Sequence, residues 1–156
     1  MGKIEDRIKE LGYTLPGEAV PGGHYVPSVP VASAGLVYTA GHVARRPDGT
    51  LVAGKLGGDL SIEEGYEAAK ITRLNLLGSL KHRIGELDRV TRVVKLFCMV
   101  NCTPEFEQQP AVANGASDLM VEIFGDKGRY ARSAVGMAGL PNNVCTEIEL
   151  IVEVSG

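Results

Sequence analysis

Residues 144–154 read VCTEIELIVEV, and polar and apolar side chains alternate along the whole stretch. One set of alternate positions holds Val144, Thr146, Ile148, Leu150, Val152 and Val154. The other set holds Cys145, Glu147, Glu149, Ile151 and Glu153. Side chains of a β-strand point alternately to the two faces of its sheet, so this period of two predicts a strand with one face in a core. A sheet built from such strands needs a second layer on its apolar face.

Two amphipathic segments can supply that layer. The segment 62–84 follows Ser61, which forms an S-x-x-E capping box with Glu64, and it ends before Gly85. The segment 110–124 starts at Pro110, a residue favoured in the first turn of a helix. Both show apolar residues at a period of 3.6, and a shorter helix is expected over residues 3–11.

The remaining apolar runs read as strands over residues 35–40, 50–53, 90–100 and 131–138. The expected order is β-β-α-β-α-β-β, an α+β two-layer sandwich in which two main helices pack on a mixed or antiparallel sheet. We expect a single domain over residues 1–156, with residues 1–24 as an N-terminal extension that carries the short helix. The second face of the sheet is half apolar and has no cover, which favours an oligomer.

Composition excludes several classes of protein. The chain has 156 residues and a formal net charge of −3, which argues against a nucleic-acid partner. An odd number of cysteines, a charged start unlike a signal peptide and no long apolar run predict a cytoplasmic protein without a membrane span. No cysteine or histidine spacing is typical of a metal site, and no glycine-rich phosphate loop is present, so we expect neither metal nor cofactor.

Three motifs near the C-terminus stand at a fixed spacing: Ala131-Arg132-Ser133-Ala134-Val135, then Leu140-Pro141, then Glu147-Ile148-Glu149. Together they resemble the signature of the RidA/YjgF family of reactive-intermediate deaminases. Residues 35–42 and the Gly85-to-Val90 segment are similar to that family as well, so the resemblance covers about residues 25–154. The longer N-terminus is typical of a divergent branch often described as endoribonuclease L-PSP-like.

The resemblance implies a chorismate-mutase-like fold and a homotrimer in which the three sheets form a central barrel. It also implies three ligand clefts between subunits. A small metabolite bearing a carboxylate is the expected ligand.

Arg132 is the first candidate for a site residue. A guanidinium is a planar, permanently charged fork that can hold a carboxylate through two hydrogen bonds, and the corresponding family arginine does so. A surface salt bridge is the other interpretation of an isolated arginine. Glu147 matches a family glutamate that positions the attacking water, and a carboxylate in a cleft can act as a general base. Glu149 and Glu153 are expected to form a solvated stripe.

The end of the strand at Ala40-Gly41-His42 matches a segment that lines the family's cleft. Gly41 has no Cβ, so a ligand can approach the main chain closely. His42 replaces the usual glutamine of the family, and it can either transfer protons or pack against the rim. The family also places a tyrosine and an asparagine at the cleft. Tyr25 is the candidate for the first, and Ser117 or Asn114 for the second.

The resemblance implies hydrolysis of 2-imino or enamine acids to 2-oxo acids and ammonia, with Arg132 and Glu147 as the catalytic residues. A protein that binds a small carboxylate without turning it over is the second hypothesis. Endoribonuclease activity is the third, and the acidic net charge argues against it.

Overall fold

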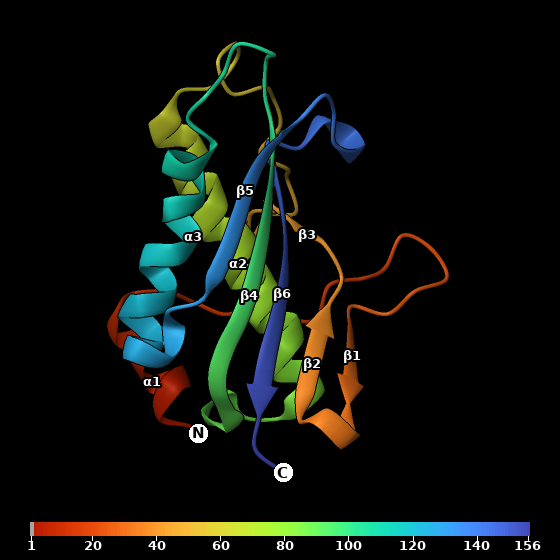
Figure 1. Ribbon diagram of the computed structural model, residues 1–156, viewed down its shortest axis with the longest axis vertical. Helices are drawn as coiled ribbons and strands as arrows, with labels where there is room; N and C mark the ends of the chain where they lie inside the picture. The colour runs from red at the N-terminus through yellow and green to blue at the C-terminus, as the bar shows by residue number, and fades with distance from the viewer. Residues whose placement is uncertain (1) are drawn as a thin grey trace.

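The computed structural model describes residues 2–156 and has two layers, as expected. Three helices cover one face of a mixed sheet: α1 (Lys3–Glu10), α2 (Ile62–Ile84) and α3 (Gln109–Phe124). Within residues 2–156, no α-helix covers the other face of the sheet (Figure 1). The α+β two-layer arrangement predicted from the sequence is therefore confirmed.

The sheet has six strands, which are β1 (Ser28–Val31), β2 (Leu36–Thr39), β3 (His42–Val43), β4 (Val90–Asn101), β5 (Ala131–Met137) and β6 (Thr146–Val154). Their order across the sheet is β1-β2-β6-β4-β5, and β3 also pairs with β6. The pairing of β4 with β5 is parallel, whereas the other pairings are antiparallel. Strand β5 consequently lies at an open edge of the sheet, next to α3.

Strand β6 forms the middle of the sheet and follows the alternation of its sequence. Ile148, Leu150 and Val152 are buried against the helices, whereas Glu149 and Glu153 are exposed on the other side. We call the first side the helix face and the second the open face. The three apolar side chains join one core with the apolar stripes of α2 and α3.

Helix α2 has the predicted ends. The backbone N–H of Glu64 donates to Ser61 Oγ at 3.2 Å, and the N–H of Ser61 donates to Glu64 Oε2 at 2.8 Å. Gly85 ends the helix with a φ of 87°. A hydrogen bond of 2.8 Å between the hydroxyls of Thr72 and Thr146 fixes the middle of α2 against β6.

The first part of the sheet differs from the prediction. Residues 50–53 were expected to form a strand, but they make only isolated bridges, Arg45 with Leu51 and Ala53 with Val144. Strand β2 pairs with β6 on one side and with β1 on the other. Strand β1 contains Pro30 and is preceded by Pro27. Proline has no N–H for the ladder and is tolerated at a sheet edge, so its presence hid this edge strand.

The N-terminal extension is bound to α2. The helix surface at Gly78 lies so close to Pro16 that a Cβ at this glycine would overlap the Pro16 carbonyl. The N–H of Ala19 donates to Ser79 Oγ at 2.9 Å. After this contact the chain forms a loop that projects beyond the sheet edge before β1 begins (Figure 1).

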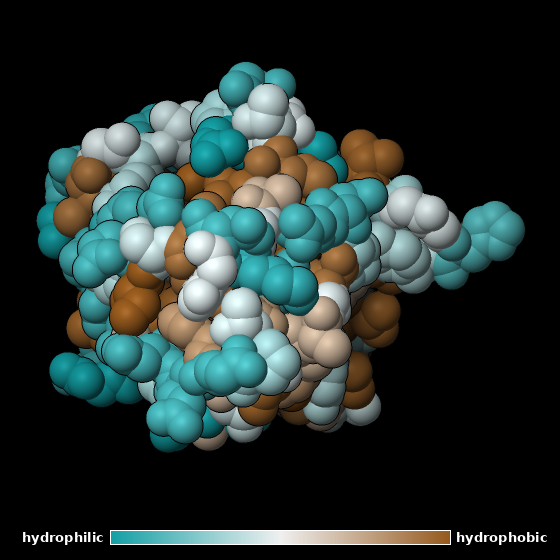
Figure 2. All heavy atoms as spheres, turned by 90° about the horizontal axis from the view of Figure 1, so that it is seen from above, coloured by the Kyte–Doolittle hydropathy of each residue, from teal (hydrophilic) through white to brown (hydrophobic). Residues whose placement is uncertain are grey.

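The open face presents apolar side chains to solvent. Val29, Tyr38 and Val135 are exposed there, from three different strands. From the upper end of the molecule, brown apolar surface emerges in several places between polar side chains (Figure 2). Within residues 2–156, no helix has both the length and the apolar character to cross a membrane.

Candidate functional site

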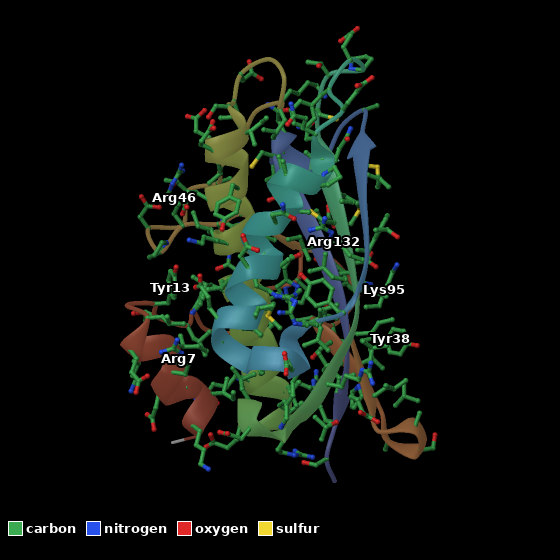
Figure 3. The ribbon with its side chains drawn as sticks, turned by 60° about the vertical axis from the view of Figure 1, so that its left-hand side comes forward. Arg7, Tyr13, Tyr38, Arg46, Lys95 and Arg132 are labelled. Carbon is green, nitrogen blue, oxygen red and sulfur yellow. The ribbon has the colours of Figure 1, made fainter. Side chains whose placement is uncertain are left out.

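Arg132 lies on the helix face of the edge strand β5. It is paired in register with Leu96 of β4, which is buried beneath the helices, and neighbouring residues in register point to the same side. Its side chain lies between α3 and the sheet, whereas Lys95 and Tyr38 point away from the opposite face (Figure 3). The guanidinium is half-buried.

One nitrogen of Arg132 is held from behind by α3. Its Nη1 donates to Asn114 Oδ1 at 2.8 Å and to Ser117 Oγ at 3.0 Å. The hydroxyl of Tyr130 donates to the same Ser117 Oγ at 2.7 Å. We call these four residues the guanidinium half-site. Both sequence candidates for the family asparagine therefore contact Arg132, and within residues 2–156 its Nε and Nη2 make no hydrogen bond.

Glu147 lies on the open face, beside the end of β2. Its carboxylate packs on Gly41 so closely that a Cβ at this glycine would overlap Oε1. Burial raises the pKa of Glu147, and the neighbouring charge of Glu149 adds to the shift. We call Gly41 and Glu147 the carboxylate half-site. A half-buried carboxylate of raised pKa, next to bare main chain, is a suitable general base.

His42 points into the core rather than toward either half-site. Its Nδ1 lies 2.9 Å from the Ala40 carbonyl oxygen, which can only accept, so Nδ1 carries the proton. Its Nε2 then accepts from Ser79 Oγ at 2.9 Å, in a buried contact. Burial lowers the pKa of His42, the Ala40 bond opposes this shift and the charge of Arg73 contributes to it. Both ring nitrogens are therefore occupied within the chain.

Ala40 and Tyr25 have separate positions. The main chain of Ala40 binds Pro27 as well as His42, because its N–H donates to the Pro27 carbonyl at 2.8 Å. Tyr25 lies in the loop before β1 and is 54% exposed. Its hydroxyl accepts from the N–H of Gly22 at 3.2 Å, and within residues 2–156 it forms no hydrogen bond with Arg132 or Glu147.

Residues 5–154 match one protein family, described as "YjgF/chorismate_mutase-like, putative endoribonuclease". The chain belongs to this RidA/YjgF family. The match covers almost the entire chain, and the order of helices and strands agrees with it.

Relatives of similar length support this membership. Protein TCP17 of Trypanosoma cruzi is 39% identical over 99% of this chain and 96% of its own. Among solved structures, Atu1372 of Agrobacterium tumefaciens is 40% identical with a TM-score of 0.89, covering 97% of this chain and 92% of that one. A Shewanella oneidensis MR-1 protein with the endoribonuclease description is 32% identical with a TM-score of 0.92, covering 98% and 100%. Escherichia coli TdcF, solved with bound serine, shares the fold at 20% identity and a TM-score of 0.59, covering 90% and 94%.

This RidA/YjgF chain has one further polar residue near Arg132 that the sequence analysis missed. Arg73 lies in the middle of α2 and is fully buried. Its Cζ lies 5.6 Å from the centre of the Tyr130 ring, which stacks on the guanidinium. The apolar stripe of the 62–84 segment runs through Ala69 and Leu77, and Arg73 takes the position between them. A charged residue within an apolar stripe is the signal that could have revealed it.

Acidic residues gather elsewhere, at the start of α1. Three carboxylate oxygens, one from each of Glu5, Glu86 and Asp88, lie within 4.8 Å of one another. The N–H groups of Gly2 and Ile4 donate to Glu86 and Asp88, as expected where a helix N-terminus attracts negative charge. Lys81 pairs with Glu5 at 3.3 Å. These contacts give the cluster a structural explanation.

Proposed function

We propose that this RidA/YjgF chain hydrolyses 2-imino acids to 2-oxo acids and ammonia in a cleft between neighbouring subunits of a homotrimer. The observation that carries the proposal is the fork of Arg132. Asn114 and Ser117 hold its Nη1 from behind, so that Nε and Nη2 are oriented together for a carboxylate. Two parallel hydrogen bonds to one carboxylate are both strong and directional.

The two half-sites support a cleft made by two chains. Arg132 is on the helix face and Glu147 is on the open face, so one chain cannot direct both at a small ligand. A neighbouring copy that covers the apolar open face would bring its own carboxylate half-site to the edge strand β5. A closed ring of identical subunits repeats one interface and so would form the same cleft at each boundary between subunits. In a trimer the open faces would enclose a central barrel.

The proposed reaction needs water and one proton carrier. Arg132 binds the substrate carboxylate, and Glu147 of the neighbouring copy accepts a proton from water as the water oxygen bonds to the imine carbon. The electron pair of the C=N bond moves to nitrogen, which takes the proton held by Glu147 and becomes an amino group. As the C–N bond then breaks, the proton of the new hydroxyl passes to this nitrogen, ammonia leaves, and the C=O bond of the 2-oxo acid forms. Positioning and proton transfer account for the rate enhancement.

The test follows the decay of 2-iminopropanoate, generated by an amino-acid oxidase, with micromolar protein. Acceleration over buffer supports the proposal, and its loss in Arg132→Ala assigns the role of the fork. Arg129→Ala is the matched control, because Arg129 is exposed and its one side-chain partner within residues 2–156 is the exposed Asp126. A wild-type decay rate equal to that of buffer would rule out imine hydrolysis.

One observation favours a second function, carboxylate binding without turnover. Arg132, Asn114, Ser117 and Tyr130 are complete as a binding half-site within one chain, whereas turnover also needs Glu147 from another. Calorimetry with serine, the ligand in the TdcF structure, would show binding that Arg132→Ala removes. Binding with no imine decay would establish this second function. Single-stranded RNA is tested as a further candidate substrate, because the family description includes the word endoribonuclease.

A further inference from the structure

Arg73 is a buried charge that the chain does not neutralise. Its side chain is 0% exposed, and none of its three guanidinium nitrogens has a hydrogen-bond partner in the described residues 2–156. Burial lowers the pKa of Arg73 to about 10, which still leaves it charged at neutral pH. An ionised group that is buried without a hydrogen-bond partner is among the most unfavourable features of a protein interior. Its retention calls for a ligand that can pair with it.

The surroundings of Arg73 are neutral. The ring of Tyr130 stacks on the guanidinium, and the thiol of Cys98 and the imidazole of His42 lie close enough to feel its charge. Burial raises the pKa of Cys98 to about 12, so the thiol stays protonated, and His42 stays uncharged for the reasons given above. None of these groups can serve as a counter-ion.

Arg73 is linked to Arg132 through one tyrosine. The Tyr130 ring covers Arg73, and its hydroxyl donates to Ser117 Oγ, the atom that also accepts from Arg132 Nη1. Two guanidinium groups thus flank Tyr130 with only neutral groups between them. Tyr130 is itself half-buried and also lines a surface groove with Arg129 and Ala131.

We propose that Arg73 is a second anion anchor, and that the ligand of this site carries two acidic groups, one bound by Arg132 and one by Arg73. The proposal rests on carboxylate binding at Arg132 but not on imine hydrolysis. The ligand class is a short dicarboxylate, such as a 2-oxo or 2-imino diacid. Its second carboxylate replaces the Tyr130 ring against the guanidinium and supplies the missing hydrogen bonds.

The test compares two acids of equal chain length, 2-oxoglutarate and 2-oxopentanoate, which differ by the second carboxylate. We expect calorimetry to show at least about tenfold tighter binding of 2-oxoglutarate to the wild type, as charge-assisted pairing with a buried guanidinium implies. Arg73→Met should remove this preference while 2-oxopentanoate binds as before. Arg73→Lys keeps the charge and should retain part of the preference, and Arg129→Met should leave it unchanged.

The two proposals can fail separately. Equal wild-type affinity for the two acids, or an unchanged preference in Arg73→Met, overturns the second anchor even if 2-iminopropanoate is hydrolysed. Failure of the wild type to bind either acid overturns the second anchor as well. Imine decay equal to that of buffer, together with a preference for 2-oxoglutarate that depends on Arg73, overturns only the hydrolysis.

Discussion

Arg132 and Glu147 lie on opposite faces of one sheet, with strand β4 between their strands. The register shows this directly, because Arg132 is level with Leu96 and Glu147 with Met99, and these two β4 residues differ by an odd number of positions. Side chains an odd number of residues apart on a strand point to opposite faces. If both residues act on one substrate, they must come from two subunits.

This relationship predicts complementation between two inactive variants. Arg132→Ala keeps the carboxylate half-site, and Glu147→Gln keeps the guanidinium half-site. Mixed oligomers refolded from equal amounts should regain about one quarter of the wild-type imine hydrolysis, because half of the subunits supply each intact half-site at random. The measurement compares the refolded mixture with each variant refolded alone. No recovery in the mixture would place both residues in a site made by one subunit.

Gly41 gives a way to move the Glu147 carboxylate without changing its charge. A Cβ in Gly41→Ala would overlap Glu147 Oε1, which is the far end of a flexible side chain and can shift. The variant should fold, and its kcat/KM for 2-iminopropanoate should fall by about 10²-fold, the size of a general-base contribution. Gly139→Ala is the control, because no atom lies within 4 Å of a Cβ at that glycine. Wild-type activity in Gly41→Ala would exclude Glu147 from the reaction.

Local sequence signals predicted the helices and the central strands. The Ser61–Glu64 capping box and Gly85 set the ends of α2, and the alternation of residues 144–154 marked the middle strand, because these features depend on nearest neighbours alone. Strand β1 was missed because, within residues 2–156, it has ladder contacts with β2 alone, and because Pro27 and Pro30 make its sequence resemble a loop. Pairing at an edge is decided by tertiary contacts rather than by local propensity.

The site was predicted less completely than the fold. The resemblance to the family indicated Arg132 and offered Ser117 or Asn114 as the asparagine equivalent in α3, whereas it did not indicate the direction of the His42 side chain. The alternation of side chains along a strand does not show which face of the short strand β3 meets the helices. Arg73 was not assigned to the interior despite its place in the apolar stripe of the 62–84 segment, because arginine is rarely buried without a partner and its neighbours Tyr130 and Cys98 are distant in sequence. The separation of Arg132 from Glu147 required the register of three strands.

Replacement of Arg73 should stabilise the chain in the absence of ligand. Arg73→Met exchanges an unpaired buried charge for an apolar side chain of similar length, and such exchanges can raise the free energy of unfolding by about 1–4 kcal/mol. Urea denaturation without added acids measures the difference. Leu77→Met, in the same stripe of α2, is the control and should cost less than about 1.5 kcal/mol. A less stable Arg73→Met would mean that the chain already satisfies the guanidinium.

His42 should make stability depend on pH. Its pKa in the folded state lies below the ordinary value of 6.5, so the unfolded chain takes up a proton first as the pH falls. Protonation therefore favours unfolding between 6.5 and the lowered pKa, and stability decreases with falling pH until both states carry the proton. The hydrogen bond that Nε2 accepts from Ser79 explains why protonation destabilises the folded state, since a protonated ring nitrogen cannot accept.

His42→Gln isolates this contribution. Glutamine does not titrate, and its amide can still donate to Ala40 and accept from Ser79. The raised pKa of Glu147 acts in the opposite direction, because it adds stability as the pH falls toward 4.5, but it is present in both proteins and cancels in their difference. Urea denaturation at intervals from pH 7.5 to pH 5 should show the wild type losing stability relative to His42→Gln below pH 6.5. A difference that is constant over this range would show that His42 binds its proton equally in both states, and the buried hydrogen bond to Ser79 would then not require a neutral ring.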